Sequence, residues 1–468
     1  MSHVAEASTA ACGAHGLGIQ NREPERITPH RLRGVVMTRV DRRRWLTASL
    51  GSAAASTAIG SPAAAFTAPT EQLQVAVIGV GNMGYGHVRR LLQRPDVRLV
   101  VVCDADRKHL QRAAETIQTT SGVVAEQVTD FRRVLDNRAV DAVVVATPHH
   151  WHAPIALRAL QAGQDVYLEK PGSHVFHEGR LLVEAARRSQ RIFQHGTQMR
   201  SSLVTARAGE VLASGVLGTI KMSKAWNCQR HRPRPSVPNE SPPPQVDYDL
   251  WLGPAPQRPF NANRFHGNWN WYRDYGNGDI GGDGVHDIDM ARWGLGVDQH
   301  PERITAHGSR IDLKGEREFP DNMLVAYHYG EGKVLIYEDR GWTPYGPYGF
   351  DSGNAFYGSE GMMVFSRRGY FQVYLGRKRE QGPAMRGDAG HPRHLFDFLD
   401  SVRSRKQTVA PAEVAHLSCG LVHLGEVAYR VGRVLHFDPQ TETVRGDDQA
   451  NELLTKAYRS PWNLPEAS

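Results

Sequence analysis

Three glycines, Gly79, Gly81 and Gly84, form a Gly-x-Gly-x-x-Gly pattern next to an apolar run at residues 74–80. The run is typical of a buried strand, and a helical stretch follows it. In a dinucleotide-binding unit the first glycine permits a tight turn, the second admits a pyrophosphate and the third lets helix and strand pack closely. The flanking strand and helix supply the context that the pattern needs. We therefore predict a phosphate site made of Gly79, Gly81, Asn82, Met83 and Gly84.

An acidic residue follows the next apolar run, residues 97–102. Asp104 lies 20 residues beyond Gly84, where a carboxylate binds the hydroxyls of the adenosine ribose. Its charge would repel a 2′-phosphate and so favours NAD, whereas Arg107 nearby offers a way to accept NADP. The other role open to Asp104 is that of a helix N-cap.

Strands and helices alternate through residue 195. Strands are expected at 74–80, 97–102, 142–146, 165–168 and 192–195, and helices at 131–135, 153–161 and 177–189. This alternation predicts a doubly wound parallel sheet, whose sites lie at the carboxyl ends of the strands. Gly79, Asp104, Thr147 and Lys170 all fall at such ends.

A histidine cluster at residues 149–152 also raises the question of a metal. His149, His150 and His152 are near neighbours, but adjacent positions point in different directions and no cysteine or carboxylate cluster lies beside them. We predict no metal site and assign these residues to cofactor lining or packing.

The second half of the chain has a different sequence pattern. Strand-like runs at 221–226, 323–329 and 333–337 favour a mainly antiparallel sheet. Six prolines between residues 233 and 245 exclude a helix and predict an extended surface loop. The predicted fold is α/β: an N-terminal Rossmann-type doubly wound parallel sheet, then a C-terminal α+β domain with an open, mainly antiparallel sheet. The predicted domains are a leader at 1–65, a nucleotide-binding domain at 66–195 and a substrate and oligomerisation domain at 196–468.

Aromatic residues crowd together between positions 265 and 275, and five glycines follow between Gly276 and Gly284. Aromatic rings suit the faces of pyranose sugars, and glycines let backbone close over a ligand. The alternative is that the aromatic residues fill a core. The acids that follow lack the spacing of a calcium loop.

Residues 147–171 and residues 276–289 resemble segments of the Gfo/Idh/MocA family. Thr147, Pro148, His152 and the run Glu169-Lys170-Pro171 match the TPxxxH…EKP pattern of that family. The resemblance implies that Lys170 lies between the nicotinamide ribose and the substrate hydroxyl. It also implies a cofactor-binding role for Thr147, Pro148, His152 and Glu169.

Residues 276–289 resemble the family motif GGGxLxDxGxHxxD, which supplies the substrate-facing base. The resemblance makes His286 that base, so Lys170 and His286 are the predicted catalytic residues. The chain departs from the motif at one position. Where the motif has its first aspartate, this chain has Gly282, and Asp283 comes one residue later. Whether Asp283 or Tyr275 orients His286 is left open. The predicted substrate-binding residues are Arg200, Tyr275, Asp283 and Asp289.

Oxidation of a secondary alcohol needs a proton acceptor near neutral pH and a cation beside the alkoxide, roles that suit His286 and Lys170. The expected activity is an NAD(P)-dependent oxidoreductase that acts on a sugar, glycoside or polyol. Alternatives are an NAD-dependent glycoside hydrolase that works by transient oxidation and elimination, and a cofactor-binding protein without turnover. The resemblance also implies a homo-oligomer, a dimer or tetramer, that associates through the sheet of the second domain.

The basic charge of the chain is concentrated at its N-terminus. The 468 residues carry a net charge of +7, and residues 1–65 contain eight arginines and four acids. Without residues 1–65, the chain has 48 basic and 45 acidic side chains, so we do not expect a nucleic-acid partner. The four cysteines form no CxxC pair, which argues against a disulfide framework or zinc knuckle.

Residues 41–47, Asp-Arg-Arg-Arg-Trp-Leu-Thr, resemble a twin-arginine export signal. The 20 residues from Leu46 to Ala65 are uncharged, and Ala63–Ala65 supplies a cleavage site that predicts a mature start near Phe66. Whether translation starts at Met1 or Met37 is open. We expect the twin-arginine export machinery as a partner and a periplasmic or secreted location. Because free NAD(P) is scarce there, we expect a tightly bound cofactor.

Overall fold

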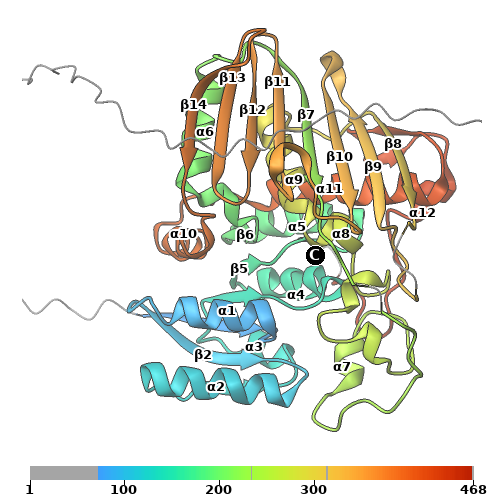
Figure 1. Ribbon diagram of the computed structural model, residues 1–468. Helices are drawn as coiled ribbons and strands as arrows, with labels where there is room; N and C mark the ends of the chain where they lie inside the picture. The colour runs from blue at the N-terminus through green and yellow to red at the C-terminus, as the bar shows by residue number, and fades with distance from the viewer. Residues whose placement is uncertain (1–71, 233, 312–314, 466–468) are drawn as a thin grey trace, which may run out of the picture. The chain divides into compact units, whose positions relative to one another are not determined.

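Six parallel strands form the sheet of the N-terminal half in the computed structural model (Figure 1), which describes residues 72–465 except 233 and 312–314. The predicted leader at 1–65 lies outside the described residues. The strands are β1 (Leu73–Ile78), β2 (Val97–Cys103), β3 (Glu126–Val128), β4 (Ala142–Val145), β5 (Asp165–Leu168) and β6 (Phe193–His195). Their order is β3-β2-β1-β4-β5-β6, which confirms the doubly wound prediction. The order reverses between β1 and β4, and that is where such sheets bind ligands.

Helices connect these strands: α1 (Asn82–Leu91), α2 (Arg107–Ser121), α3 (Arg132–Asp136), α4 (His149–Gln161) and α5 (Phe176–Ser189). Helix α4 begins four residues earlier than predicted, directly after Pro148, so the histidines lie in its first turn. Helix α2 was not predicted, although its buried residues Leu110, Ala113, Ala114 and Ile117 have the spacing of an amphipathic helix.

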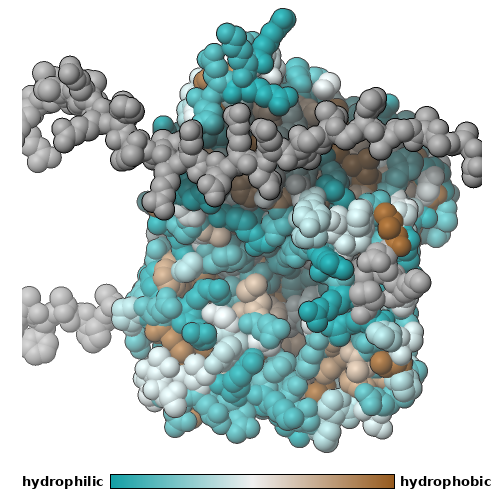
Figure 2. Space-filling model, in the orientation of Figure 1, coloured by the Kyte–Doolittle hydropathy of each residue, from teal (hydrophilic) through white to brown (hydrophobic). Residues whose placement is uncertain are grey.

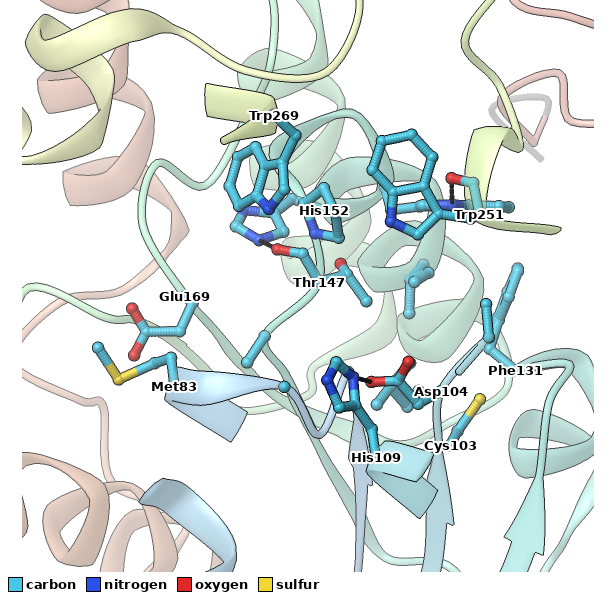
Figure 3. Close-up of a pocket in the computed structure, with 18 of the residues that line it drawn as sticks. Met83, Cys103, Asp104, His109, Phe131, Thr147, His152, Glu169, Trp251 and Trp269 are labelled. Carbon is cyan, nitrogen blue, oxygen red and sulfur yellow. Dashed lines mark hydrogen bonds and ion pairs between the residues drawn. The ribbon is translucent and has the colours of Figure 1, made fainter. Parts of the chain in front are cut away.

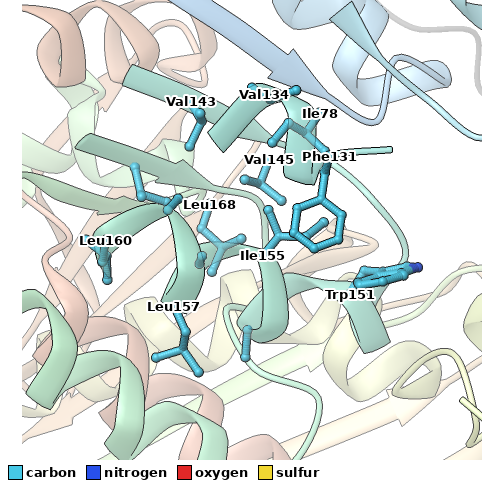
Figure 4. Packing of buried hydrophobic residues seen from close by; sticks show 14 of the residues in the cluster. Ile78, Phe131, Val134, Val143, Val145, Trp151, Ile155, Leu157, Leu160 and Leu168 are labelled. Atoms are coloured by element: carbon cyan, nitrogen blue, oxygen red, sulfur yellow. The ribbon is translucent and has the colours of Figure 1, made fainter. Parts of the chain in front are cut away.

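One face of the sheet packs on α4 and α5 (Figure 4). Strand residues such as Val143, Val145 and Leu168 meet Ile155 and Leu160 of α4, all at most 2% exposed. Burying each such side chain contributes about 1.5–3 kcal/mol to folding. The carboxyl ends of the strands are held rigidly by this core, and so are the side chains that follow them.

The other face is covered partly by α10 (His391–Ser404), a helix from the C-terminal part of the chain. Its residues Leu395, Phe398, Leu399 and Val402 join the same cluster as the strand residues Val75 and Val77. The nucleotide-binding sheet ends at β6, beside the predicted boundary at 195–196, but its core is completed by a helix some 200 residues later.

The second sheet has ten strands in the order β14-β13-β12-β11-β7-β10-β9-β8-β15-β16. All neighbours pair antiparallel except β7 and β10, which are parallel, so the mainly antiparallel prediction is confirmed. The strands are β7 (Ile220–Asn227), β8 (Arg303–Ser309), β9 (Asn322–His328), β10 (Val334–Arg340), β11 (Ser352–Gly358), β12 (Gly361–Ser366), β13 (Tyr370–Leu375), β14 (Glu380–Arg386), β15 (Leu435–Asp438) and β16 (Thr443–Val444).

The remaining helices are α6 (Leu203–Ala213), α7 (Tyr248–Leu252), α8 (Gly278–Gly282), α9 (Gly284–Leu295), α11 (Ala412–Val431) and α12 (Asp448–Glu452), with 3-10 turns at Gln198–Ser201, Ala262–Arg264, Trp269–Trp271, Gly330–Gly332 and Pro347–Gly349. Helix α9 packs against β7 and β11, and α11 packs against α5 and β8. Helices α9 and α11 lie between the second sheet and the nucleotide-binding half (Figure 1).

On the face shown in Figure 2, hydrophilic residues predominate and hydrophobic ones are scattered among them. Of the described helices, none is both long and apolar enough to cross a membrane.

Candidate active site

The three glycines of the first loop have three different surroundings. Gly79 has a φ of +84°, and a Cβ there would lie 2.7 Å from the carbonyl oxygen of Ala146. A Cβ on Gly84 would lie 1.7 Å from the carbonyl oxygen of Gly79, so helix and strand touch there. A Cβ on Gly81 would meet only the His109 ring, at 3.7 Å. The first glycine makes the turn, the third permits packing, and the second leaves backbone open to a ligand.

A cleft of about 330 Å³ opens beside this loop (Figure 3). Every predicted cofactor residue except Gly84 lines it: Gly79, Gly81, Asn82, Met83, Asp104, Thr147, Pro148, His152, Glu169 and Lys170. Gly84 lies behind the loop, in its packing position. The hydroxyl of Thr147 is buried and has no hydrogen-bond partner among the described residues. An exposed backbone loop and an unpartnered hydroxyl at the carboxyl ends of β1 and β4 fit a bound dinucleotide.

Asp104 lies at one end of the cleft. Its Oδ2 accepts a hydrogen bond from the Val80 amide at 2.9 Å, and its Oδ1 accepts one from the Asp106 amide at 2.9 Å. The carboxylate is 3.3 Å from Nδ1 of His109. The N-cap of α2 is Asp106, which accepts from the amide of Lys108. The N-cap alternative for Asp104 is therefore wrong, and its carboxylate is held at the edge of the cleft.

A segment of the second half crosses to this end of the cleft. We call residues 240–275 the strap. The amide of Arg107 donates to Gln245 at 3.1 Å, and the amide of Asp247 donates to Ala105 at 2.9 Å. On the same segment His266 lies 2.9 Å from the Asp106 carboxylate. The strap is anchored to the loop between β2 and α2, and it extends the predicted proline-rich loop.

Most aromatic residues of the strap form a core of their own. Phe265, Trp271 and Tyr272 are buried in a cluster with Trp251, so core filling is their role. Trp251 and Trp269 also line the cleft, opposite Asp104 and His109 in Figure 3.

Tyr275 belongs to this core and is fully buried. Its ring centre lies 4.9 Å from that of Trp251 and 5.4 Å from that of His150, and burial raises the pKa of its hydroxyl. The structure does not bring Tyr275 to the cleft. The expectation that it binds substrate or orients His286 is therefore corrected.

The histidines of α4 face separate partners. His149 Nδ1 lies 3.0 Å from the Asn277 side-chain oxygen, and His150 Nε2 lies 3.0 Å from the carbonyl oxygen of Trp251. His152 faces two backbone carbonyl groups, one after β4 at 2.8 Å and one after β5 at 2.6 Å. It ties the ends of two neighbouring strands together.

Two other groups of potential metal ligands come together among the described residues: Asp106, His109 and His266, and His300, His416 and Glu442. Arg180 donates to both oxygens of Glu442, so the carboxylate charge is already neutralised by a guanidinium. In the first group Asp106 caps α2 and pairs with His266. Both groups are accounted for as hydrogen-bonded ion pairs.

The other end of the cleft contains Lys170, directly after β5. Its Nζ donates to the carbonyl oxygen of Gly282 at 2.5 Å and lies 3.7 Å from Oδ1 of Asp283. A Cβ on Gly282 would lie 2.7 Å from Nδ2 of Asn270. An aspartate at this position, where the family motif has one, would require the side-chain amide of Asn270 to move.

Asp283 is held from two sides. Its Oδ2 accepts from Gln229 at 2.5 Å and lies 3.3 Å from Arg367. Burial acts to raise the pKa of this carboxyl, but the charges of Lys170 and Arg367 hold it well below its usual range. Asp283 is therefore ionised and pairs with Lys170. The alternative in which it orients the ring of His286 has no hydrogen bond to support it among the described residues.

His286 lies in the first turn of α9, near the same charges. Its side chain is almost fully buried. Burial, followed by the charges of Lys170 and Arg367, holds the pKa of the imidazole well below its usual value. The ring is therefore neutral at physiological pH and able to accept a proton.

The two remaining predicted substrate residues form a pair with each other. Asp289 is fully buried and accepts from Arg200 at 2.6 and 2.8 Å and from Ser418 at 2.6 Å. Burial acts to raise the pKa of Asp289, but Arg200 holds it at about 2. Both oxygens of Asp289 are thus occupied, so the structure does not present this carboxylate to a substrate; Asp289 orients Arg200 instead.

Glu169 lines the cleft, yet its carboxylate is anchored behind it. It lies 2.8 Å from His87 Nε2 and accepts from Gln198 at 2.8 Å. Burial acts to raise its pKa, but the hydrogen bond with His87 and the charge of Lys170 hold it at about 2. Sequence reasoning missed His87, Gln198, Gln229 and Arg367, because no motif in the chain contains them.

Comparisons with known proteins agree with this geometry. Residues 73–197 match the model of an oxidoreductase family with an NAD-binding Rossmann fold, and residues 211–352 and 383–464 match the C-terminal alpha/beta domain of the same family. Glycosyl hydrolase family 109 protein 1 of Shewanella sp. strain ANA-3 is 30% identical over 151 residues, 31% of this chain. That match spans only 33% of the relative's length.

Solved structures share the fold. A levoglucosan dehydrogenase in complex with NADH and levoglucosan has a TM-score of 0.60 at 19% identity, covering 78% of this chain and 99% of that one. The aldose-aldose oxidoreductase from Caulobacter crescentus, complexed with glycerol, has a TM-score of 0.60 at 17% identity, covering 78% of this chain and 100% of that one. With an NAD-binding Rossmann domain and the matching C-terminal domain, the chain belongs to the Gfo/Idh/MocA oxidoreductase family.

Proposed function

We propose that the protein is an NAD-dependent oxidoreductase that moves a hydride between NAD and a secondary alcohol of a sugar, glycoside or polyol. The observation that carries this proposal is the position of Lys170 in the lining of the dinucleotide cleft, 3.7 Å from the ionised Asp283, with the neutral His286 beside this pair and outside the lining of the cleft. Bound NAD supplies the hydride acceptor for alcohol oxidation. The residues supply the proton chemistry.

Each group has one task in this reaction. The neutral imidazole of His286 accepts the hydroxyl proton of the substrate. The ammonium group of Lys170 stabilises the negative charge that develops on the same oxygen. Asp283 pairs with Lys170 and holds its ammonium group in place, because its Oδ1 lies 3.7 Å from Nζ. Trp269 lines the cleft beside His149 and offers an aromatic face to a sugar ring.

Product analysis tests the proposal. Purified protein is incubated with a panel of sugars and nitrophenyl glycosides while the absorbance of the reduced nicotinamide is followed. A keto-sugar formed together with reduced cofactor supports the oxidoreductase. Cofactor spectra that never change across the panel, in wild type and Lys170→Ala alike, favour a binding protein without turnover.

A glycoside hydrolase that works by transient oxidation is the second candidate. It is favoured by the similarity to the Shewanella protein named as a glycosyl hydrolase of family 109. In that case C–H oxidation, elimination of the aglycone, water addition and re-reduction leave the cofactor unchanged. Free nitrophenol with no net keto-sugar would establish the hydrolase and exclude simple dehydrogenation.

We further propose a tightly bound cofactor, export and self-association. The strap supports tight binding, because Trp251, His266 and Trp269 form one wall of the cleft while Asp106 anchors the segment. The arginines at 42–44 support export through the twin-arginine route to the periplasm or outside, and family resemblance supports a homo-oligomer. Heat denaturation should release about one dinucleotide per chain; none released would contradict tight binding. Fractionation of expressing cells tests the location.

A further inference from the structure

Arg367 reaches the reaction end of the cleft from the far side. It lies in the turn between β12 and β13, outside every motif of the sequence, and its side chain is only 12% exposed. Its guanidinium lies 3.3 Å from Asp283 Oδ2 and 3.6 Å from Asp287 Oδ2, and its Nε donates to Ser352 at 2.9 Å. A buried cation therefore bridges two carboxylates on either side of His286 in the chain.

The two carboxylates differ in charge. Asp287 is fully buried, and neither oxygen has a hydrogen-bond partner among the described residues. Burial raises the pKa of Asp287 to about 8, so it is mostly protonated at neutral pH. Arg367 consequently finds its anionic partner in Asp283, which it shares with Lys170. Removal of Arg367 would leave Asp283 with Lys170 and Gln229 alone.

Arg367 and Gln229 both contact Oδ2 of Asp283, and Lys170 faces Oδ1. These contacts to both oxygens of Asp283 matter because the chain has glycine at position 282, where the family motif has an aspartate. The carboxylate comes from the next residue instead. A side chain displaced by one residue along the chain starts from a different direction. It needs partners on one oxygen to turn the other toward Lys170.

We propose that Arg367 is a positioning residue of the catalytic centre: from the far side of the charged cluster beside His286, it holds Asp283 with one oxygen toward Lys170. The inference rests on the proposed oxidoreductase function. Arg367 acts through Asp283 and His286, and we assign it no contact with substrate.

The groups that face His286 come from three places. Lys170 and Glu169 belong to the loop after β5, Arg367 to the β12–β13 turn and Asp283 to the start of α9, and all four act on the imidazole. The two cations lower the pKa of His286, and the two carboxylates raise it. Burial is the largest cause of the lowered pKa of His286 and stays in place without Arg367, but one cation then faces two carboxylates, so the pKa rises.

Arg367→Gln is the main variant, Arg367→Lys keeps the charge, and Arg368→Gln is the matched control. Arg368 is the next residue, but its side chain is 54% exposed and pairs with Asp351 at the surface. The expected result for Arg367→Gln is an acidic limb of kcat/KM moved by about one pH unit to higher pH. We expect Arg367→Lys to keep the acidic limb at its wild-type pH but with a lower kcat, and Arg368→Gln to overlay the wild-type profile.

A measurement that needs no catalytic turnover tests the role of Arg367 independently of the proposed function. Proteins labelled with 13C at the histidine Cε1 are titrated between pH 5 and 8, with the His286 signal assigned by its loss in His286→Gln. The titration midpoint of the His286 signal should lie at higher pH in Arg367→Gln than in wild type. An unchanged His286 signal in folded Arg367→Gln overturns the proposal, even if the protein is active.

If wild type turns over no sugar, the proposed function fails and the titration still decides the role of Arg367. If Arg367→Gln does not fold, Arg367→Lys decides it. The expected result is then a wild-type titration with kcat reduced at least threefold, because lysine cannot reach Asp283, Asp287 and Ser352 together. A kcat equal to that of wild type overturns the proposal.

Discussion

The two ends of the cleft are built in different ways. At the adenosine end, Gly79, Gly81 and Asp104 lie on two consecutive strand–helix loops, and backbone conformation does most of the work. At the reaction end, three charged side chains and one amide meet from four distant segments: Lys170, Asp283, Arg367 and Gln229. A site made of local backbone leaves a short motif in the sequence. At the reaction end Lys170 also lies in a short motif, but its more distant partners Gln229 and Arg367 do not, because they come from segments far away in the chain.

The largest effect should come from the reaction end. In His286→Gln the general base is lost, so we expect kcat to fall by about 10²–10⁴-fold. Cofactor content should remain that of wild type, because His286 is not among the residues that line the cleft. Single-turnover kinetics and dinucleotide content measured on the same preparation check both parts. A variant that has lost its cofactor as well would show that the two ends are not separable.

Two alanine variants of one loop sharpen the comparison at the other end. Gly84→Ala places a Cβ 1.7 Å from a backbone oxygen, so we expect the free energy of unfolding to fall by about 3 kcal/mol or more. Gly81→Ala places a Cβ in the open cleft, so stability should be unchanged while dinucleotide affinity falls at least tenfold (about 1.4 kcal/mol). Denaturant unfolding and cofactor content measure the pair. Equal stabilities would refute the separate roles of these glycines.

Asp104→Asn should change which dinucleotide is bound. The amide keeps the shape of the side chain and one acceptor oxygen, but it removes the charge that repels a 2′-phosphate. We expect the affinity for NAD to fall about tenfold (about 1.4 kcal/mol) and the preference for NAD over NADP to narrow. Competition binding with both dinucleotides provides the measurement. An unchanged preference would assign discrimination to another residue.

The last effect, one that leaves activity and cofactor choice aside, is a dependence of stability on pH from Glu169, which lies between the two ends. Its pKa is about 2 in the folded protein, below the ordinary value of 4.5. A lowered folded-state pKa means that the stabilisation is complete above about pH 5 and is lost as the pH falls toward 2. The full contribution is about 3 kcal/mol. Denaturant unfolding between pH 3 and 7 should show a shallower acid loss in Glu169→Gln than in wild type; parallel curves would contradict the assignment.

Much of the fold followed from sequence patterns. The alternation of apolar runs with helices predicted the parallel sheet, and the short strands of the second half predicted the mainly antiparallel one. The missed helix α2 had an apolar stripe, so its signal was present in the chain. The role of Tyr275 was wrong because an aromatic residue near a glycine run looks the same whether it faces a ligand or a core.

The sequence by itself determined the backbone features: glycine at the turn, at the open loop and at the close approach of helix and strand, and a carboxylate after β2. These features depend on φ angles and steric size, which are properties of single residues and their neighbours. Only the tertiary structure decided which charges surround His286 and why Asp289 is turned toward Arg200. Electrostatic interactions act through space, so they depend on contacts between segments far apart in the chain.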